Sequence, residues 1–197
     1  MNDGRSLWRR TLDAHRSACE RLDDTHAAAL DRLADAVLSA WAAGGKLLVC
    51  GNGGSAADSQ HLAAELVGRY RRERPAWPAI ALTTDTSALT AVGNDFGFDH
   101  VFARQVEALG AAGDVLLVIS TSGNSRNCVE AVRAARARGL ACHGLLGGDG
   151  GALVDAVDHA LVVPADETPR IQELHLIMIH ALCESLEERR RPKDAPS

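Results

Sequence analysis

The sequence lacks the patterns that mark several common classes of protein. No apolar run approaches the roughly 20 residues that a membrane span requires, and residues 1–8 carry no apolar signal core. The five cysteines are odd in number and include no Cys-x-x-Cys pair, which is typical of reduced thiols rather than of a disulfide framework or a zinc ribbon. The formal net charge of −5 disfavours a nucleic-acid surface. We therefore expect a soluble, cytoplasmic protein that binds neither nucleic acid nor membrane.

The pattern that is present alternates short apolar runs with helical segments. Two amphipathic helices are predicted first, at about 6–22 and 26–43, and Gly44-Gly45 ends the second. Five apolar runs then follow at 46–50, 79–82, 115–119, 141–146 and 160–163. Continuous runs of this length indicate strands buried on both faces. Their alternation with helices indicates a parallel sheet with right-handed crossovers.

We therefore predict one domain over residues 1–197, with a three-layer α/β/α sandwich around a five-stranded parallel sheet. Residues 1–45 form N-terminal helices, 46–188 form the α/β core with a last helix at about 169–188, and 189–197 form a tail. In such a sheet the ligand crevice lies beyond the carboxyl ends of the strands. Functional residues are therefore expected in the segments that follow the strands.

A glycine-rich loop, Gly51-Asn52-Gly53-Gly54-Ser55, follows the first predicted strand and leads into a helix. Glycines let backbone N–H groups approach a ligand closely, although a plain tight turn has the same composition. His61 and Glu65 lie one turn apart on that helix, so they share one face. They could hold a metal or a substrate proton, or they could simply be an exposed pair.

A hydroxyl-rich loop, Ser120-Thr121-Ser122-Gly123-Asn124-Ser125, follows the third predicted strand and also opens a helix. Hydroxyls together with a helix N-terminus can surround a phosphate without any lysine. One serine would be enough to cap the helix, so four hydroxyls favour phosphate binding over capping alone. The sequence contains neither a Walker loop nor a Gly-x-Gly-x-x-Gly fingerprint with an acidic partner, which disfavours a dinucleotide.

Other polar segments allow more than one interpretation. The last helix carries His175 and His180 among apolar residues, and spacing alone does not choose between a core histidine and a functional one. For Gly93–Phe98 a turn is favoured over a sugar-binding role for its Asn and Asp. Gly147–Gly151 is interpreted as a flexible connection, and Arg69–Arg74 as a solvated loop in which Arg69 could turn inward.

Together these residues resemble the phosphoheptose isomerase family, that is, sedoheptulose-7-phosphate isomerases of the SIS fold. The resemblance covers roughly residues 30–190. It rests on five segments, which are Cys50–Tyr70, Arg74–Leu82, Val92–Phe98, Ile119–Ser125 and Arg170–His175. The resemblance implies a single SIS domain, one Zn²⁺ per subunit, a sugar-phosphate substrate, and a homotetramer with active sites at subunit interfaces.

The resemblance also implies a role for each matching residue. The family's zinc ligands fall on His61, Glu65, Gln172 and His180. Substrate contacts fall on Asn52, Gly53, Gly54, Ser55, Glu65, Asn94, Asp95, Ser120, Thr121, Ser122, Ser125 and Gln172. Glu65 and His180 correspond to the proposed base and acid. Thr168-Pro169 stands where some members have an Asp before the Arg, so no role of that Asp is carried over.

The implied reaction converts D-sedoheptulose 7-phosphate to D-glycero-D-manno-heptose 7-phosphate through an enediol, the first step of nucleotide-activated heptose biosynthesis. The main alternative is a non-catalytic SIS module of the replication-initiator-associating type, which binds a sugar phosphate or a protein. An amino-sugar or pentose-phosphate isomerase on the same scaffold is a second alternative. The presence of all four acid–base and metal residues favours the phosphoheptose isomerase.

The spacing of Gln172 and His180 bears on how the site is assembled. They are eight residues apart, about 12 Å of helix rise at 1.5 Å per residue, so one helix could hardly bring both to one ion. We therefore hypothesise that the site is shared and that these two residues come from different protomers. On this hypothesis, mixing Glu65→Gln with His180→Ala protomers is expected to restore some activity.

Overall fold

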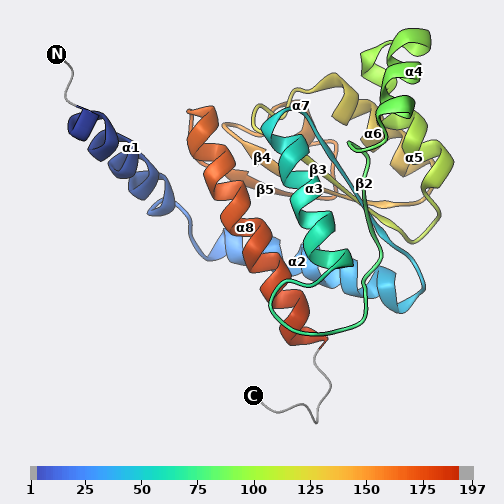
Figure 1. The fold of residues 1–197 in the computed structure, drawn as a ribbon, viewed down its shortest axis with the longest axis horizontal. Helices are drawn as coiled ribbons and strands as arrows, with labels where there is room; N and C mark the ends of the chain where they lie inside the picture. Colours follow the sequence, from blue (N-terminus) through green and yellow to red (C-terminus); the bar gives the residue numbers. More distant parts are fainter. Residues whose placement is uncertain (1–3, 191–197) are drawn as a thin grey trace.

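The computed structural model describes residues 4–190 and contains one five-stranded sheet (Figure 1). All neighbouring strands are parallel, in the order β2-β1-β3-β4-β5. The strands are β1 (Leu47–Gly51), β2 (Ala79–Ala81), β3 (Val115–Ser120), β4 (Ala141–Gly147) and β5 (His159–Val163). The predicted five-stranded parallel sheet is confirmed, and each strand lies within one or two residues of its predicted bounds.

Helices cover both faces of the sheet, which confirms the three-layer arrangement. The helices are α1 (Gly4–Cys19), α2 (Asp24–Ala42), α3 (Gly54–Val67), α4 (Thr86–Phe96), α5 (Ala103–Leu109), α6 (Arg126–Ala137), α7 (Gly151–Val154) and α8 (Thr168–Arg189), with a short 3-10 turn η1 (Phe98–His100). One core cluster packs α2, α3 and α8 on the sheet, and the other packs α5, α6 and α7 on the opposite face. Residues alternate between the two clusters along β1 and β3, because successive side chains point to opposite faces.

The N-terminal helices differ in how they pack. Helix α2 lies on the sheet, whereas α1 extends away from the remainder of the domain (Figure 1). Ala18 is the one buried residue among the described side chains of α1, and Leu7, Trp8 and Leu12 on that helix are exposed. The predicted tail begins at residue 189, but α8 continues through Arg189, and residues 191–197 lie outside the described part of the chain.

None of the helices between residues 4 and 190 combines the length and apolar character needed to cross a membrane.

Candidate active site

The glycine-rich and hydroxyl-rich loops lie side by side at the carboxyl edge of the sheet. They follow β1 and β3, which are adjacent, with Gly51 paired to Ile119 at the ends of the two strands. The chain passes from β1 to β2 on one side and then returns to β3 on the other, so the strand order reverses between β1 and β3. A reversal of this kind opens a crevice for a ligand in open α/β sheets.

The backbone of the glycine-rich loop lies close to the last helix, α8. Gly53 has φ +56° and precedes α3 without a side-chain cap. A Cβ added at Gly54 would lie 2.3 Å from Nε2 of Gln172, so only glycine leaves room for that side chain. Gln172, in the first turns of α8, therefore lies over the start of α3. Ser55 is buried directly behind this contact.

Asn52 is held by a residue that the sequence analysis did not identify. Its Nδ2 donates to Oδ1 of Asn127, and Nδ2 of Asn127 donates back to Oδ1 of Asn52, both at 2.8 Å. Asn127 is buried in the first turn of α6. This amide pair joins the loop after β1 to the helix after β3, and no spacing in the sequence indicates it.

The hydroxyl-rich loop leaves donors available for an anion. Ser120 ends β3 with its Oγ 3.2 Å from Oγ of Ser125, and Ser125 precedes α6 without capping it through its side chain. Ser122 is exposed and its Oγ accepts the backbone N–H of Asn124 at 3.2 Å, while Thr121 is half-buried. The arrangement favours the phosphate interpretation, since the hydroxyls are not consumed by capping.

Gly147–Gly151 supports that loop, so its interpretation as a flexible connection is wrong. A Cβ on Gly123 would lie 1.9 Å from the carbonyl oxygen of Gly150, and the Leu153 N–H donates to the Gly123 carbonyl at 2.9 Å. Gly148, Gly150 and Gly151 all have positive φ, which lets the segment fold closely against Ser122–Asn124. Packing, rather than flexibility, explains these glycines.

A hollow of about 410 Å³ opens beside the hydroxyl-rich loop. Its lining residues come from the ends of β3 and β4 and from the start of α8, and they are Thr121, Ser122, Gly147, Gly148, Asp149, Ala165, Asp166, Thr168 and Ile171. This is room enough for a small polar ligand at the expected edge of the sheet.

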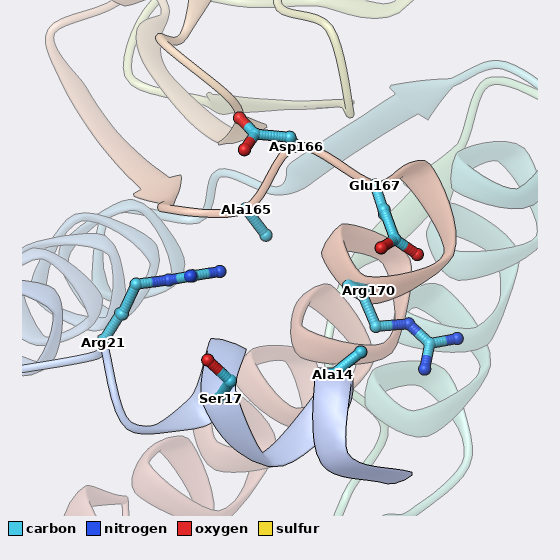
Figure 2. Close-up of a pocket in the computed structure, with 7 residues that line it drawn as sticks. All are labelled: Ala14, Ser17, Arg21, Ala165, Asp166, Glu167 and Arg170. Atoms are coloured by element: carbon cyan, nitrogen blue, oxygen red, sulfur yellow. The ribbon is translucent and has the colours of Figure 1, made fainter. Parts of the chain in front are cut away.

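A second hollow, of about 240 Å³, lies on the α1 side of the same segment. Figure 2 shows Arg21 and Ser17 pointing toward the chain that carries Ala165 and Asp166. Arg170, which also lines it, is already bonded to the Thr11 carbonyl at 2.7 Å and to Glu173 at 2.7 Å. The contact with the Thr11 carbonyl attaches α1 to α8, and this packing gives the hollow a structural explanation.

His61, Glu65 and His180 come together from two helices. His61 Nε2 lies 3.2 Å from Oε1 of Glu65 and 3.3 Å from Nε2 of His180, and all three side chains are half-buried. His175 differs, because it is fully buried with Nε2 3.0 Å from the Leu146 carbonyl oxygen, and burial lowers its pKa. The structure therefore places His175 in the core and His180 at the site.

The side chains of His61, Glu65 and His180 are of the types that bind metals, but within one chain they do not form a metal-binding group. Imidazole and carboxylate are suitable zinc ligands. However, nowhere in residues 4–190 do three or more His, Cys, Asp and Glu side chains form a group that could hold a metal ion.

Gln172 lies away from this row of side chains. On α8, Gln172 contacts Gly54, and His180, eight residues later, contacts His61. Gly54 and His61 are seven residues apart on α3, so the two contacts lie at similar spacings along the two helices. The two helices run side by side in the same direction (Figure 1). Seven residues of α3 correspond to about 10 Å, which separates Gln172 from the His61 contact within one chain. Glu65 and His180 both contact His61 in one chain, which differs from the expectation that Glu65 and His180 variants complement each other.

Asn94 and Asp95 lie apart from these contacts. The turn expected over Gly93–Phe98 is wrong in its first part, since α4 continues through Phe96 before η1 begins. Both side chains are exposed, and Nδ2 of Asn94 donates to Oδ1 of Asp95 at 2.8 Å.

The arginine-rich segment is more structured than expected. Arg69 is exposed, in agreement with a solvated loop, but the Arg74 side chain is 9% exposed and pairs with the buried carboxylate of Glu187 at 3.2 Å. The buried partner lies more than a hundred residues away, so no local pattern could have indicated it.

Three of the buried cysteines are unsuited to act as nucleophiles. All five are free thiols, and four are buried. A contact with Cys128 and burial raise the pKa of Cys50, and burial raises that of Cys142 to about 11 and that of Cys183 to about 12. These three thiols stay protonated near neutral pH.

Comparison with known proteins first defines the class. The SIS domain family matches residues 12–147. A protein named phosphoheptose isomerase from Bradyrhizobium sp. (strain ORS 278) is 56% identical over 184 residues, covering 92% of this chain and 93% of that protein.

Two solved structures agree in fold and sequence. The phosphoheptose isomerase of Neisseria gonorrhoeae superposes with a TM-score of 0.82 at 47% identity, and that of Francisella tularensis with 0.84 at 41%. Each comparison covers 93% of this chain and 96% of the solved chain.

The fold and the site thus define a SIS-domain sugar-phosphate enzyme. The chain belongs to the phosphoheptose isomerase family. It is an aldose–ketose isomerase of heptose metabolism, and the non-catalytic alternative is set aside.

Proposed function

We propose that this chain converts D-sedoheptulose 7-phosphate to D-glycero-D-manno-heptose 7-phosphate through an enediol intermediate. The observation that carries the proposal is the meeting of His61, Glu65 and His180 from α3 and α8 beside two ligand-type loops. The free thiols agree with a cytoplasmic location, which we also propose.

The reaction moves one proton between carbons and one between oxygens. In the proposed direction, the Glu65 carboxylate takes a proton from C1 of the ketose, exchanges it with solvent, and delivers a proton to C2. His180 handles the hydroxyl protons, so that the oxygen on C2 gains a proton and the oxygen on C1 loses one. A carboxylate can accept a proton from carbon, and an imidazole can both donate and accept a proton, so the two groups suit these transfers.

The loops divide the substrate between them. We assign the phosphate to Ser120, Thr121, Ser122, Ser125 and the start of α6, where hydroxyl and N–H donors gather. We assign the sugar end to Asn52, Gly53, Gly54, Ser55 and Gln172, with Asn94 and Asp95 as further contacts. In one chain Asn94 and Asp95 lie on an exposed helix end. We therefore propose that they contact the sugar only once the subunits have assembled.

We further propose that His61, Glu65 and His180 hold one Zn²⁺ in the assembled protein, with Gln172 as the fourth ligand. Among the described residues of a single chain these side chains do not yet form a metal-binding group, so assembly or the ion itself must bring them together. When bound, the ion would polarise the substrate carbonyl and stabilise negative charge on its oxygen. Metal analysis of the purified protein tests this without an activity assay. We expect about one zinc per chain, lost in His61→Ala; metal-free wild-type protein after zinc supplementation would contradict the role.

The site is proposed to be shared within a homotetramer, with Gln172 supplied by the partner subunit. The separation of Gln172 from His61 in one chain supports this. The test mixes Gln172→Ala with His180→Ala protomers, each inactive alone, and measures recovered turnover in verified mixed oligomers. A Glu65→Gln with His180→Ala mixture is the matched control, for which no recovery is expected. Absence of recovery in the first mixture would contradict the shared site.

A further inference from the structure

Glu187 is a buried carboxylate that the proposed reaction does not use. It lies on α8 seven residues after His180, about two helical turns, so the two residues share a face of that helix. It is 5% exposed, although a buried charge is costly unless it is well bonded.

The loop after α3 wraps around this carboxylate. Glu187 accepts the backbone N–H of Tyr70 at 3.3 Å, of Arg71 at 3.2 Å and of Arg72 at 3.1 Å. Nε of Arg74 donates to it at 3.2 Å. Consecutive N–H groups and a guanidinium compensate the buried charge and fix the course of the loop.

Arg74 extends the same network to the end of α3. Its Nη2 donates to the carbonyl of Glu65 at 2.7 Å and its Nη1 to that of Leu66 at 2.9 Å, which satisfies carbonyls that the helix end leaves without partners. Its guanidinium also lies 3.6 Å from the ring centroid of Trp77. The Arg74–Glu187 pair thus links the helix that carries Glu65 to the helix that carries His180.

The loop held in this way places an aromatic ring on the site. The Tyr70 ring stacks on the His180 imidazole, with centroids 5.7 Å apart and planes 27° apart. The other neighbour of that imidazole is His61, whose ring lies edge-on with centroids 5.1 Å apart. His180 is therefore bounded by Tyr70 and by His61.

We propose that Tyr70, whose backbone N–H is bonded to the Glu187 carboxylate that Arg74 holds in place, is a positioning residue that holds His180 with Nε2 toward His61. It acts by limiting the rotamers of His180, so that the imidazole stays in its productive orientation before substrate binds. This inference rests on the role proposed for His180. The ring face, rather than the hydroxyl, supplies the contact.

The kinetic test compares Tyr70→Ala with Tyr70→Phe. We expect Tyr70→Ala to lower kcat by about 10- to 100-fold with little change in KM, because misplacement of a reacting group affects the transition state most. Tyr70→Phe keeps the stacked ring and should stay near wild type. Arg72→Ala is the matched control, since the exposed Arg72 contributes only its backbone N–H to Glu187.

A spectroscopic test separates this inference from the proposed reaction. The ring-proton signals of His180, assigned by their loss in His180→Gln, carry a ring-current shift from Tyr70. That shift should disappear in Tyr70→Ala and persist in Tyr70→Phe and Arg72→Ala, whether or not the substrate is the correct one. Tyr70→Leu replaces Tyr70→Ala if the latter fails to fold.

Two results would overturn the positioning role. One is an unmoved His180 signal in Tyr70→Ala. The other is an equal loss of kcat in Tyr70→Phe and Tyr70→Ala, which would assign the effect to the hydroxyl.

Discussion

At the scale of single residues, Glu65 carries the enzyme assignment. It lies 3.2 Å from His61 and is half-buried, so its side chain contributes little to the core. We expect Glu65→Gln to lower kcat by about 10²- to 10⁴-fold, the usual range for a lost general base, with an unchanged melting temperature. Glu184→Gln, an exposed carboxylate that pairs with Arg71, is the control and should keep its activity. Near-normal turnover by Glu65→Gln would remove the base from the mechanism.

Gly54 tests the contact between α3 and α8. In Gly54→Ala the new methyl would collide with the end of the Gln172 side chain, which must swing away. Because that end is flexible, we expect little change in the melting temperature but a loss of activity as the Gln172 amide leaves its place. Thermal unfolding and turnover of Gly54→Ala and wild type check this. A fully active Gly54→Ala would contradict the close approach.

Single residues also show where reasoning from sequence stopped. Spacing on the last helix could not choose between His175 and His180, because both lie among apolar residues. The distinction comes from tertiary contacts: one imidazole meets the Leu146 carbonyl in the core and the other meets His61. Asn127 and Glu187 could not be found either, since their partners lie 75 and more than 110 residues away.

At the scale of elements, the sheet was predictable and the segments around the crevice were less so. Strands such as β3 are buried on both faces and therefore leave continuous apolar runs. Helix α4 has no buried residue, and Leu89 and Val92 pack only partly against the core, so its apolar pattern is weak. Asp85 caps it by accepting the Ala88 N–H at 2.9 Å and was a further signal. Gly147–Gly151 was misjudged because composition does not distinguish flexibility from close packing.

The strength of the link between the two ligand loops can be measured as a coupling free energy. Each amide of the Asn52–Asn127 pair loses two hydrogen bonds when the other is removed, so each single Ala variant already loses both bonds. The double Ala variant should therefore be destabilised less than the sum of the two single variants. We expect a coupling of about 0.5–3 kcal/mol in a double-mutant cycle of urea unfolding. Strict additivity would show that the two loops are held independently.

At the scale of the whole molecule, a buried histidine makes stability depend on pH. Burial, and then the neighbouring His159, lower the pKa of His143 from 6.5 to about 4; Asp158 and Arg32 are the other charged groups that act on it. Between these values the unfolded chain binds a proton that the folded chain does not, so stability falls as the pH drops from about 6.5 toward 4. Because one pKa unit corresponds to about 1.4 kcal/mol, the full loss of stability over this interval is about 3 kcal/mol.

Urea unfolding at pH 7 and pH 5 measures this dependence. We expect His143→Leu to lose less stability than wild type over that interval, because the group that titrates in the unfolded chain is gone. His159→Asn, at an exposed position on β5, should behave more like wild type. An equal loss in wild type and His143→Leu would contradict the assignment.

The fold, the two ligand loops and the contact between α3 and α8 all support the proposed isomerisation. The most direct measurement incubates zinc-replete protein with D-sedoheptulose 7-phosphate in D₂O and follows the products by NMR. We predict formation of the aldose heptose 7-phosphate with deuterium at C2, since an enediol exchanges its proton, and much slower formation with Glu65→Gln. Absence of turnover by the zinc-replete wild-type protein would contradict the account.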